Sequence, residues 1–218
     1  MHPNAGSRTA VALVVVASSS HGGSRIDSPL FLFMNTLPTI RIQSSYLFEE
    51  RFNMRPITKK EIKEYTVAWK KHEAVLLLAM QNVTGLYFAQ NIIDVYVVNP
   101  DMIGGLSDPL IIGGGMTPQR FICVLAHELV HRLMFDNTKK VDWHKSAWKI
   151  WKKEEHLVAH HVVVHAILEQ ICLDASLVKM LSEDKEIAAR SKNAYNQAWE
   201  IVKKEGYKNI IAKLKSYK

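Results

Sequence analysis

Two histidines and a glutamate stand at the spacing H-E-x-x-H, at His127, Glu128 and His131, inside an apolar run. On a helix, positions i and i+4 lie one above the other on the same face, so both histidines can direct a ring nitrogen at one metal ion. Glu128 follows next along the helix, within reach of a water on that metal. Two neutral imidazoles and a nearby carboxylate are what zinc-assisted hydrolysis requires. The pattern predicts one Zn²⁺ per chain, with Glu128 as the catalytic base.

The residues around this motif predict a helix that carries it at mid-length. Thr117 can cap a helix and Pro118 suits its first position. Apolar residues then recur at helical spacing, at Phe121, Val124, Leu125, Leu129 and Leu133. Asp136-Asn137 supply a stop. The motif therefore lies where two ligands one turn apart can share a metal.

A catalytic zinc ion needs a third protein ligand, which the motif helix does not supply. In the pattern H-E-x-x-H-x-x-G-x-x-H the third ligand follows closely, but Met134 and Asn137 stand at the glycine and third-histidine positions. The apolar segment 154–176 carries His161 and His165 at a second i, i+4 spacing. A buried imidazole needs a partner for each ring nitrogen, and a metal ion provides one. We predict that His161 or His165 completes the site.

Other polar side chains of the same segment have different expected roles. Glu169 follows His165 by four residues, and Glu169 or Asp174 is expected to orient a ligand from behind. Glu169 also remains an alternative third ligand. His156 and His160 are expected to take no part in metal binding.

The elements before the motif predict a small sheet. The chain gives an extended segment near 39–42, a helix at 58–81, strands at 92–98 and 109–112, a turn at 103–105 and a glycine turn at 113–115. After the motif it is nearly all helical, at 143–153, 154–176 and 186–204, with a last short helix after Gly206. We expect an α+β fold, mostly helical, with a small sheet preceding the H-E-x-x-H helix.

This order of elements, with the H-E-x-x-H residues, resembles the zincin metallopeptidases over roughly residues 58–175. The resemblance implies a zinc-dependent endopeptidase that acts on a peptide or protein, and a sheet whose edge strand pairs with extended substrate. That strand would be 109–112, although an ordinary buried strand explains the same residues equally well. Arg132 departs from the family pattern, which usually has an uncharged residue there, and we expect it to extend outward.

Two branches of that family bear on the third ligand. Gluzincins take a Glu from a second helix, and the spacing from His165 to Glu169 is similar, with His in place of the ligand Glu. A site completed by a downstream His is also similar to SprT-type proteases, but the two cysteines, Cys123 and Cys172, cannot build the zinc ribbon common there. Both cysteines are expected to be buried and free. Tyr195 or His144 would donate to the oxyanion, and the sequence does not choose between them.

The amino-acid composition limits the classes of partner that the protein is expected to bind. Of 218 residues 48% are hydrophobic and 22% charged, and the formal net charge is +7. The lysines are spread out without an arginine-rich block, so no dedicated nucleic-acid site is expected. No apolar run approaches 18 residues, so no membrane span is expected. The oligomeric state is not indicated.

The first residues are set apart from the domain. Arg8 precedes an apolar run at 10–17, which has the shape of a short signal peptide. The same residues also fit a leader with no targeting function. Alternatively, the translation start is placed too early and Met34 is the true one. We assign 1–36 to a disordered leader or signal-like segment and 37–218 to a zincin-like domain. A cytoplasmic location is expected, or a secreted one if residues 1–20 act as a signal.

Two other classes of protein share these features. Glu128 and His131 also form E-x-x-H, the unit of di-iron bundles, but no second unit follows Glu154 or Glu155. A non-catalytic metal-binding helical protein therefore remains an alternative. So does a nucleic-acid-associated protein whose metal site is structural.

Overall fold

The computed structural model describes residues 37–45, 56–99, 104–190 and 193–217. These residues belong to one compact unit, Asn35–Lys218. The leader or signal-like segment assigned to 1–36 lies outside them.

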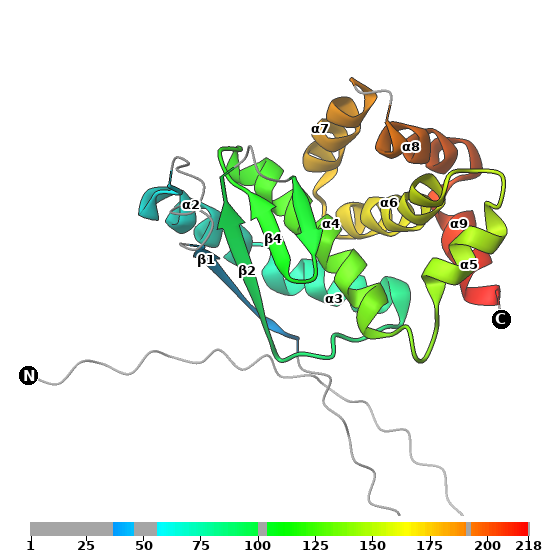
Figure 1. The fold of residues 1–218 in the computed structure, drawn as a ribbon, viewed down its shortest axis with the longest axis horizontal. Helices are drawn as coiled ribbons and strands as arrows, with labels where there is room; N and C mark the ends of the chain where they lie inside the picture. The colour runs from blue at the N-terminus through cyan, green and yellow to red at the C-terminus, as the bar shows by residue number, and fades with distance from the viewer. Residues whose placement is uncertain (1–36, 46–55, 100–103, 191–192, 218) are drawn as a thin grey trace, which may run out of the picture. The chain divides into compact units, whose positions relative to one another are not determined.

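A four-stranded mixed sheet precedes the motif helix (Figure 1). Its strands are β1 (Thr39–Ser44), β2 (Ile92–Val98), β3 (Gly105–Ser107) and β4 (Leu110–Gly113). They lie in the order β1-β2-β4-β3; β1, β2 and β4 are parallel, and β3 runs antiparallel to β4. The predicted strand at 92–98 is confirmed, and the extended segment near 39–42 is a full strand.

The edge strand is not the one that the sequence suggested. All four residues of β4 are buried, and β4 lies between β2 and β3. The expectation that 109–112 forms the substrate-facing edge is wrong, and the alternative of a buried strand is correct. β3, expected as part of a turn, takes the edge through the pairing of Leu106 with Ile111. Three residues that begin with glycine carry no strand pattern, so only the pairing with β4 creates this strand.

Eight helices lie within the described part of the chain, so the mostly helical α+β class is confirmed. They are α2 (Lys59–Lys70), α3 (Glu73–Thr84), α4 (Pro118–Asp136), α5 (Trp143–Ile150), α6 (His156–Asp174), α7 (Val178–Ala189), α8 (Ala194–Glu205) and α9 (Tyr207–Ser216). The motif helix begins as predicted, because the Thr117 side chain accepts from the backbone N–H of Arg120 and Pro118 follows. The last helix begins after Gly206, also as predicted.

Two helix predictions are wrong in their bounds. The expected helix at 58–81 is broken before Glu73, whose carboxylate accepts from the backbone N–H of Ile40 and from the indole of Trp69. The bond from Ile40, 33 residues earlier in the chain, holds the start of α3 against β1, which no local pattern encodes. The expected helix at 186–204 is two helices, because Asn193 accepts from two backbone N–H groups and begins α8.

The central helix α6 contacts α3, α4, α5, α7, α8 and α9 (Figure 1). By length and composition it is apolar enough to cross a membrane, contrary to the expectation that no such run exists. Its mean hydropathy is 1.3, and 67% of the apolar window is buried inside the protein. The protein's own helices therefore cover this apolar surface, as they cover a core helix. Cys123 on α4 and Cys172 on α6 are buried and free, as predicted.

The side chain of Arg132 is buried, so the expectation that it extends outward is wrong. Its guanidinium donates to Asp136, one turn along α4, at 3.0 Å and to Asp108 at 2.5 Å. Asp108 lies between β3 and β4. Arg132 therefore ties the motif helix to the edge of the sheet, next to the second motif histidine.

Replacing Arg132 by Met should destabilise the protein by about 2–4 kcal/mol, because it leaves the buried carboxylate of Asp136 without its cation. Urea unfolding followed by circular dichroism measures this. As a control, Lys60→Met removes the exposed pair with Glu64, where N and O are 3.9 Å apart, and should leave the midpoint nearly unchanged. Equal midpoints for the two variants would contradict the assigned role of Arg132.

Candidate metal centre

Helix α4 places His127, Glu128 and His131 in the interior. The exposed fractions of His127 and Glu128 are 8% and 7%. Phe121 anchors the first turns of α4 by stacking on Tyr65 of α2, with ring centroids 4.1 Å apart. The Tyr65 hydroxyl donates to the carbonyl of Met116 at 3.0 Å, just before the helix. The motif is thereby held at a fixed depth between the sheet and α6.

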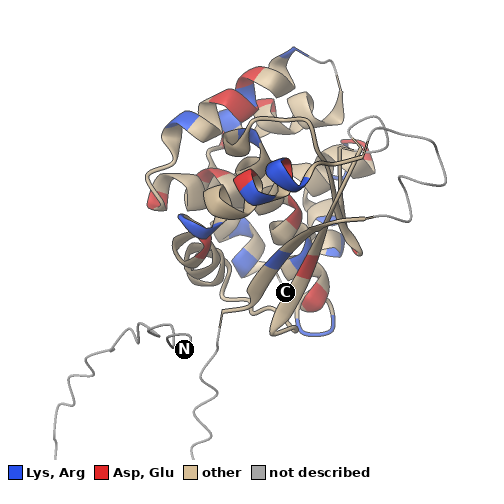
Figure 2. Cartoon of the chain, turned by 90° about the vertical axis from the view of Figure 1, so that its left-hand side faces the viewer, with Lys and Arg blue, Asp and Glu red and all other residues tan. Residues whose placement is uncertain are grey.

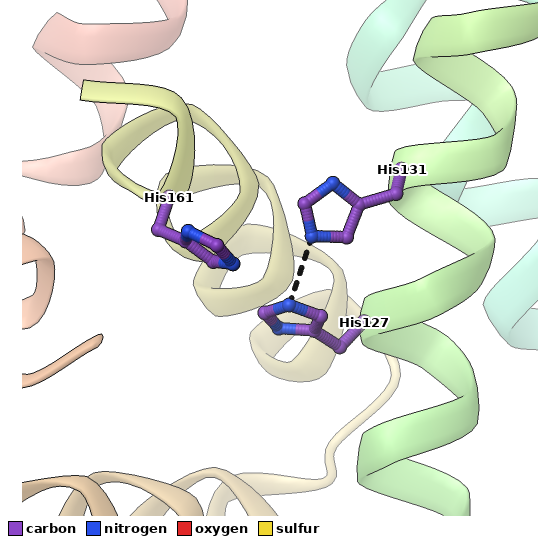
Figure 3. A group of neighbouring side chains, drawn as sticks. All are labelled: His127, His131 and His161. Carbon is purple, nitrogen blue, oxygen red and sulfur yellow. Dashed lines mark hydrogen bonds between the residues drawn. The ribbon is translucent and has the colours of Figure 1, made fainter. Parts of the chain in front are cut away.

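Three imidazoles converge between α4 and α6 (Figure 3). The Nε2 atoms of His127 and His131 lie 3.0 Å apart. His161 of α6 faces this pair, and one ligand nitrogen from each of the three lies within 4.8 Å of the others. The Nδ1 atom of His161 is 2.8 Å from the carbonyl of Leu157, so Nδ1 carries the proton and Nε2 offers a lone pair. The three residues form a buried cluster that could hold a metal ion.

The protonation of this cluster suits a metal. Burial lowers the pKa of all three imidazoles, well below the usual range for His127, and the neighbouring histidines lower that of His127 and His131 further. Neutral imidazole is the form that ligates Zn²⁺. Nitrogens of an ideal tetrahedral zinc site lie about 3.3 Å apart, from a Zn–N distance of about 2.05 Å. His127 and His131, with Nε2 atoms 3.0 Å apart, are near this spacing, and a metal ion would draw His161 toward them from its place within 4.8 Å.

His165, the other candidate for the third ligand, lies beside the cluster. Its ring centroid is 5.5 Å from that of His127. The ring stacks on the indole of Trp199 in α8, with centroids 4.3 Å apart and planes 11° apart. Its Nδ1 atom is buried and has no hydrogen-bond partner among the described residues. The structure thus brings both predicted histidines of α6 to the site, with His161 in the cluster.

The acidic residues expected behind the ligands lie elsewhere. Glu169 forms an ion pair with Lys185 of α7 at 2.9 Å. Asp174 accepts from the amide of Gln170 at 2.7 Å. Neither belongs to the cluster, so the prediction that Glu169 or Asp174 orients a ligand is wrong.

Two histidines outside the cluster are linked to it: His160 contacts His131, and His144, which the sequence suggested only as an oxyanion donor, contacts His160. Nε2 of His160 is 2.7 Å from Nδ1 of His131, the nitrogen that faces away from the cluster. Nδ1 of His160 is 2.6 Å from Nδ1 of His144 on α5. The only signal in the sequence was the density of histidines in α6, and His160 was expected to take no part in metal binding.

A cavity of about 330 Å³ opens beside the cluster. Its lining includes His127, Glu128, His165, Gly105 of β3 and Tyr195 of α8. Burial raises the pKa of Glu128 to about 7. The phenol ring of Tyr195 lies over His161, with centroids 4.3 Å apart. A molecule in this cavity would touch the carboxylate of Glu128, the phenol of Tyr195 and, of the three cluster histidines, His127.

The same geometry separates the two candidate oxyanion donors. Tyr195 lines the cavity, whereas His144 is hydrogen-bonded to His160 behind the cluster. Of the two, only Tyr195 lies where it can contact a molecule in the cavity.

Comparison with family models, with curated proteins and with solved structures finds no match for this chain.

His161 and His165 can be separated by metal binding. His161→Ala should abolish stoichiometric binding of Zn²⁺, because two imidazoles alone do not hold the ion in competition with a chelator. His165→Ala should retain one zinc per chain. Elemental analysis after dialysis against a weak chelator measures both, with the exposed His156→Ala as control. Zinc loss in His165→Ala alone would reverse the assignment.

Proposed function

We propose that this protein is a zinc-dependent peptidase. One observation carries the proposal: a buried carboxylate, Glu128, lines the same cavity of about 330 Å³ as His127, a member of the cluster of three imidazoles. Three histidine ligands beside an open space is the arrangement of a catalytic zinc site, whereas a structural site is closed by a fourth protein ligand. His127, His131 and His161 would hold the ion.

When bound, zinc would supply Lewis acidity to a water and to the scissile carbonyl. The chain's own side chains would transfer the proton and stabilise the developing charge. Glu128 would take a proton from the attacking water and return it to the leaving amine. A carboxyl group with a raised pKa exchanges protons readily near neutral pH, and a neighbouring dication would shift Glu128 back toward its charged form. Tyr195 would donate a hydrogen bond from its hydroxyl to the oxygen that becomes negative.

Strand β3 is the element that would align the substrate. It is the edge strand of the sheet, and within the described ranges no strand pairs with its outer side. Gly105 of β3 also lines the cavity next to Glu128. An extended peptide that pairs with β3 through main-chain hydrogen bonds would place its backbone beside the carboxylate. The substrate class supported is therefore an extended peptide segment.

The other two classes have less support. The cluster that the described residues form holds histidines alone, whereas a di-iron bundle requires bridging carboxylates from several helices. Lys and Arg are interleaved with Asp and Glu over the helices (Figure 2). A nucleic-acid-associated protein would bind a polyanion column with steep salt dependence and hydrolyse no unfolded protein.

Glu128→Gln should retain zinc and reduce hydrolysis of an unfolded protein substrate by about 10²–10⁴-fold, because the amide cannot accept the proton. Chromatography of the cleavage products and elemental analysis of the same sample measure the two effects. Glu200→Gln, an exposed change on α8, serves as control. Undiminished hydrolysis by the Glu128 variant would rule out the proposed mechanism.

Two neighbouring glycines give a second test that removes no polar side chain. A Cβ atom at Gly105 would lie 2.3 Å from Oε1 of Glu128, whereas one at Gly104 meets no described atom within 4 Å. Since Oε1 ends a flexible side chain, Gly105→Ala should displace the carboxylate without unfolding the protein. We expect Gly105→Ala to lose most hydrolysis while retaining zinc.

Gly104→Ala is the matched control and should keep the parent rate. Similar rates for the two alanine variants would mean that the position of the Glu128 carboxylate does not govern the reaction.

A further inference from the structure

The cluster is supported from behind by a row of imidazoles rather than by a carboxylate. Nδ1 of His131 meets His160 at 2.7 Å, and the far nitrogen of His160 meets His144 at 2.6 Å. The rings lie nearly parallel: His131 and His160 are inclined by 8°, and His160 and His144 by 12°. We call His131, His160 and His144 the histidine row.

Separate helices hold the members of this row. His131 belongs to α4, His160 to α6 and His144 to α5. Helix α5 is short, and its first turn is fixed by Asp142, which accepts from the backbone N–H of Lys145 at 2.9 Å. Its residues Trp143 and Ala147 are buried, and α5 packs on α6. The row therefore depends on how three helices pack.

When a metal is bound, the placement of protons fixes the direction of the hydrogen bonds along the row. A neutral imidazole carries one N–H, and ligation through Nε2 requires the proton of His131 to be on Nδ1. That N–H then donates to Nε2 of His160, whose own proton must be on Nδ1 and donates to His144. His144 in turn carries its proton on Nε2.

Without a metal, two patterns compete. Nε2 of His131 is 3.0 Å from Nε2 of His127, so one of them donates to the other. If His131 donates there, its Nδ1 must accept from His160 and every proton of the row is reversed. Metal binding through Nε2 permits one pattern only.

We propose that His160 and His144 are positioning residues of the metal centre, which hold His131 in the tautomer and orientation that ligate the ion. This inference rests on the metal site of the proposed function, but not on peptide hydrolysis. Partners of this kind behind a ligand raise metal affinity by about 10–100-fold. No carboxylate is needed, because His160 accepts from His131 and is itself fixed by His144.

Zinc affinity, measured by competition with a chromophoric chelator and without any peptide, tests the role. His160→Ala should bind Zn²⁺ about 10–100-fold more weakly. His160→Gln should recover most of the affinity, because its amide oxygen can accept from Nδ1 of His131. His144→Ala should show a smaller loss. His156→Ala, an exposed histidine on the same helix, is the matched control and should bind zinc as the parent does.

Proton NMR of the zinc-loaded protein adds a signature that a loss of packing alone would not reproduce. The row predicts two downfield imidazole N–H resonances, from Nδ1 of His131 and Nδ1 of His160. His144→Ala should remove protection from the second alone, His160→Ala should affect both, and His156→Ala neither.

Parent affinity in a folded His160→Ala variant would overturn the proposal. If that variant fails to fold, His144→Ala decides: loss of the His160 resonance without any change in zinc affinity would overturn the proposal equally. A protein that binds zinc with the predicted affinities but hydrolyses no peptide would refute the proposed function and leave the histidine row intact.

Discussion

The structure depends on the burial of neutral imidazoles where α4 crosses α6. His127, His161 and His165 are each less than a tenth exposed, in surroundings made mainly of valine, alanine and leucine. A buried polar atom without a partner costs about 1–3 kcal/mol, so each ring nitrogen must find a neighbour or a metal. Leu157 supplies one carbonyl, and the histidines themselves supply most of the other contacts. The same burial keeps the imidazoles uncharged and raises the pKa of Glu128 to about 7. One environment thereby sets the protonation of both the imidazoles and the carboxyl group that the proposed function requires.

The parts of the fold that the sequence predicted are those set by local pattern. The start of α4 follows from Thr117 and Pro118, and β2 from its run of β-branched residues. The errors arose where long-range contacts override that pattern. Glu73 begins a new helix where it accepts from the backbone N–H of Ile40, 33 residues earlier in the chain. β3 exists because β4 pairs with it, and nothing in Gly105–Ser107 predicts a strand without that partner.

For the site, too, only the features set by local pattern could be predicted from the sequence. The spacing of His127 and His131 is a property of one helix, and the sequence suffices to place them on one face. The role of His160 is a property of two helices. Adjacent residues of a helix point about 100° apart, yet His160 and His161 both reach His131, one at its Nδ1 and the other toward its Nε2. That happens only where α6 crosses directly in front of this ring. The pattern of residues along one segment cannot predict where α6 crosses α4.

His165 decides whether this centre is open or closed. Four imidazoles around one ion would give a saturated structural site, with no position left for water or substrate. His165 is close enough to become a fourth ligand, since its ring centroid is 5.6 Å from that of His161. Its ring is instead held flat against the indole of Trp199, which α8 brings over α6. Stacking with an aromatic ring contributes about 0.5–1.5 kcal/mol beyond the burial of area, which opposes rotation of His165 toward the metal. By restraining this one ring, α8 keeps His165 at the wall of the cavity that His127, Glu128 and Tyr195 also line, and in the proposed function a coordination position left open is what separates a catalytic centre from a structural one.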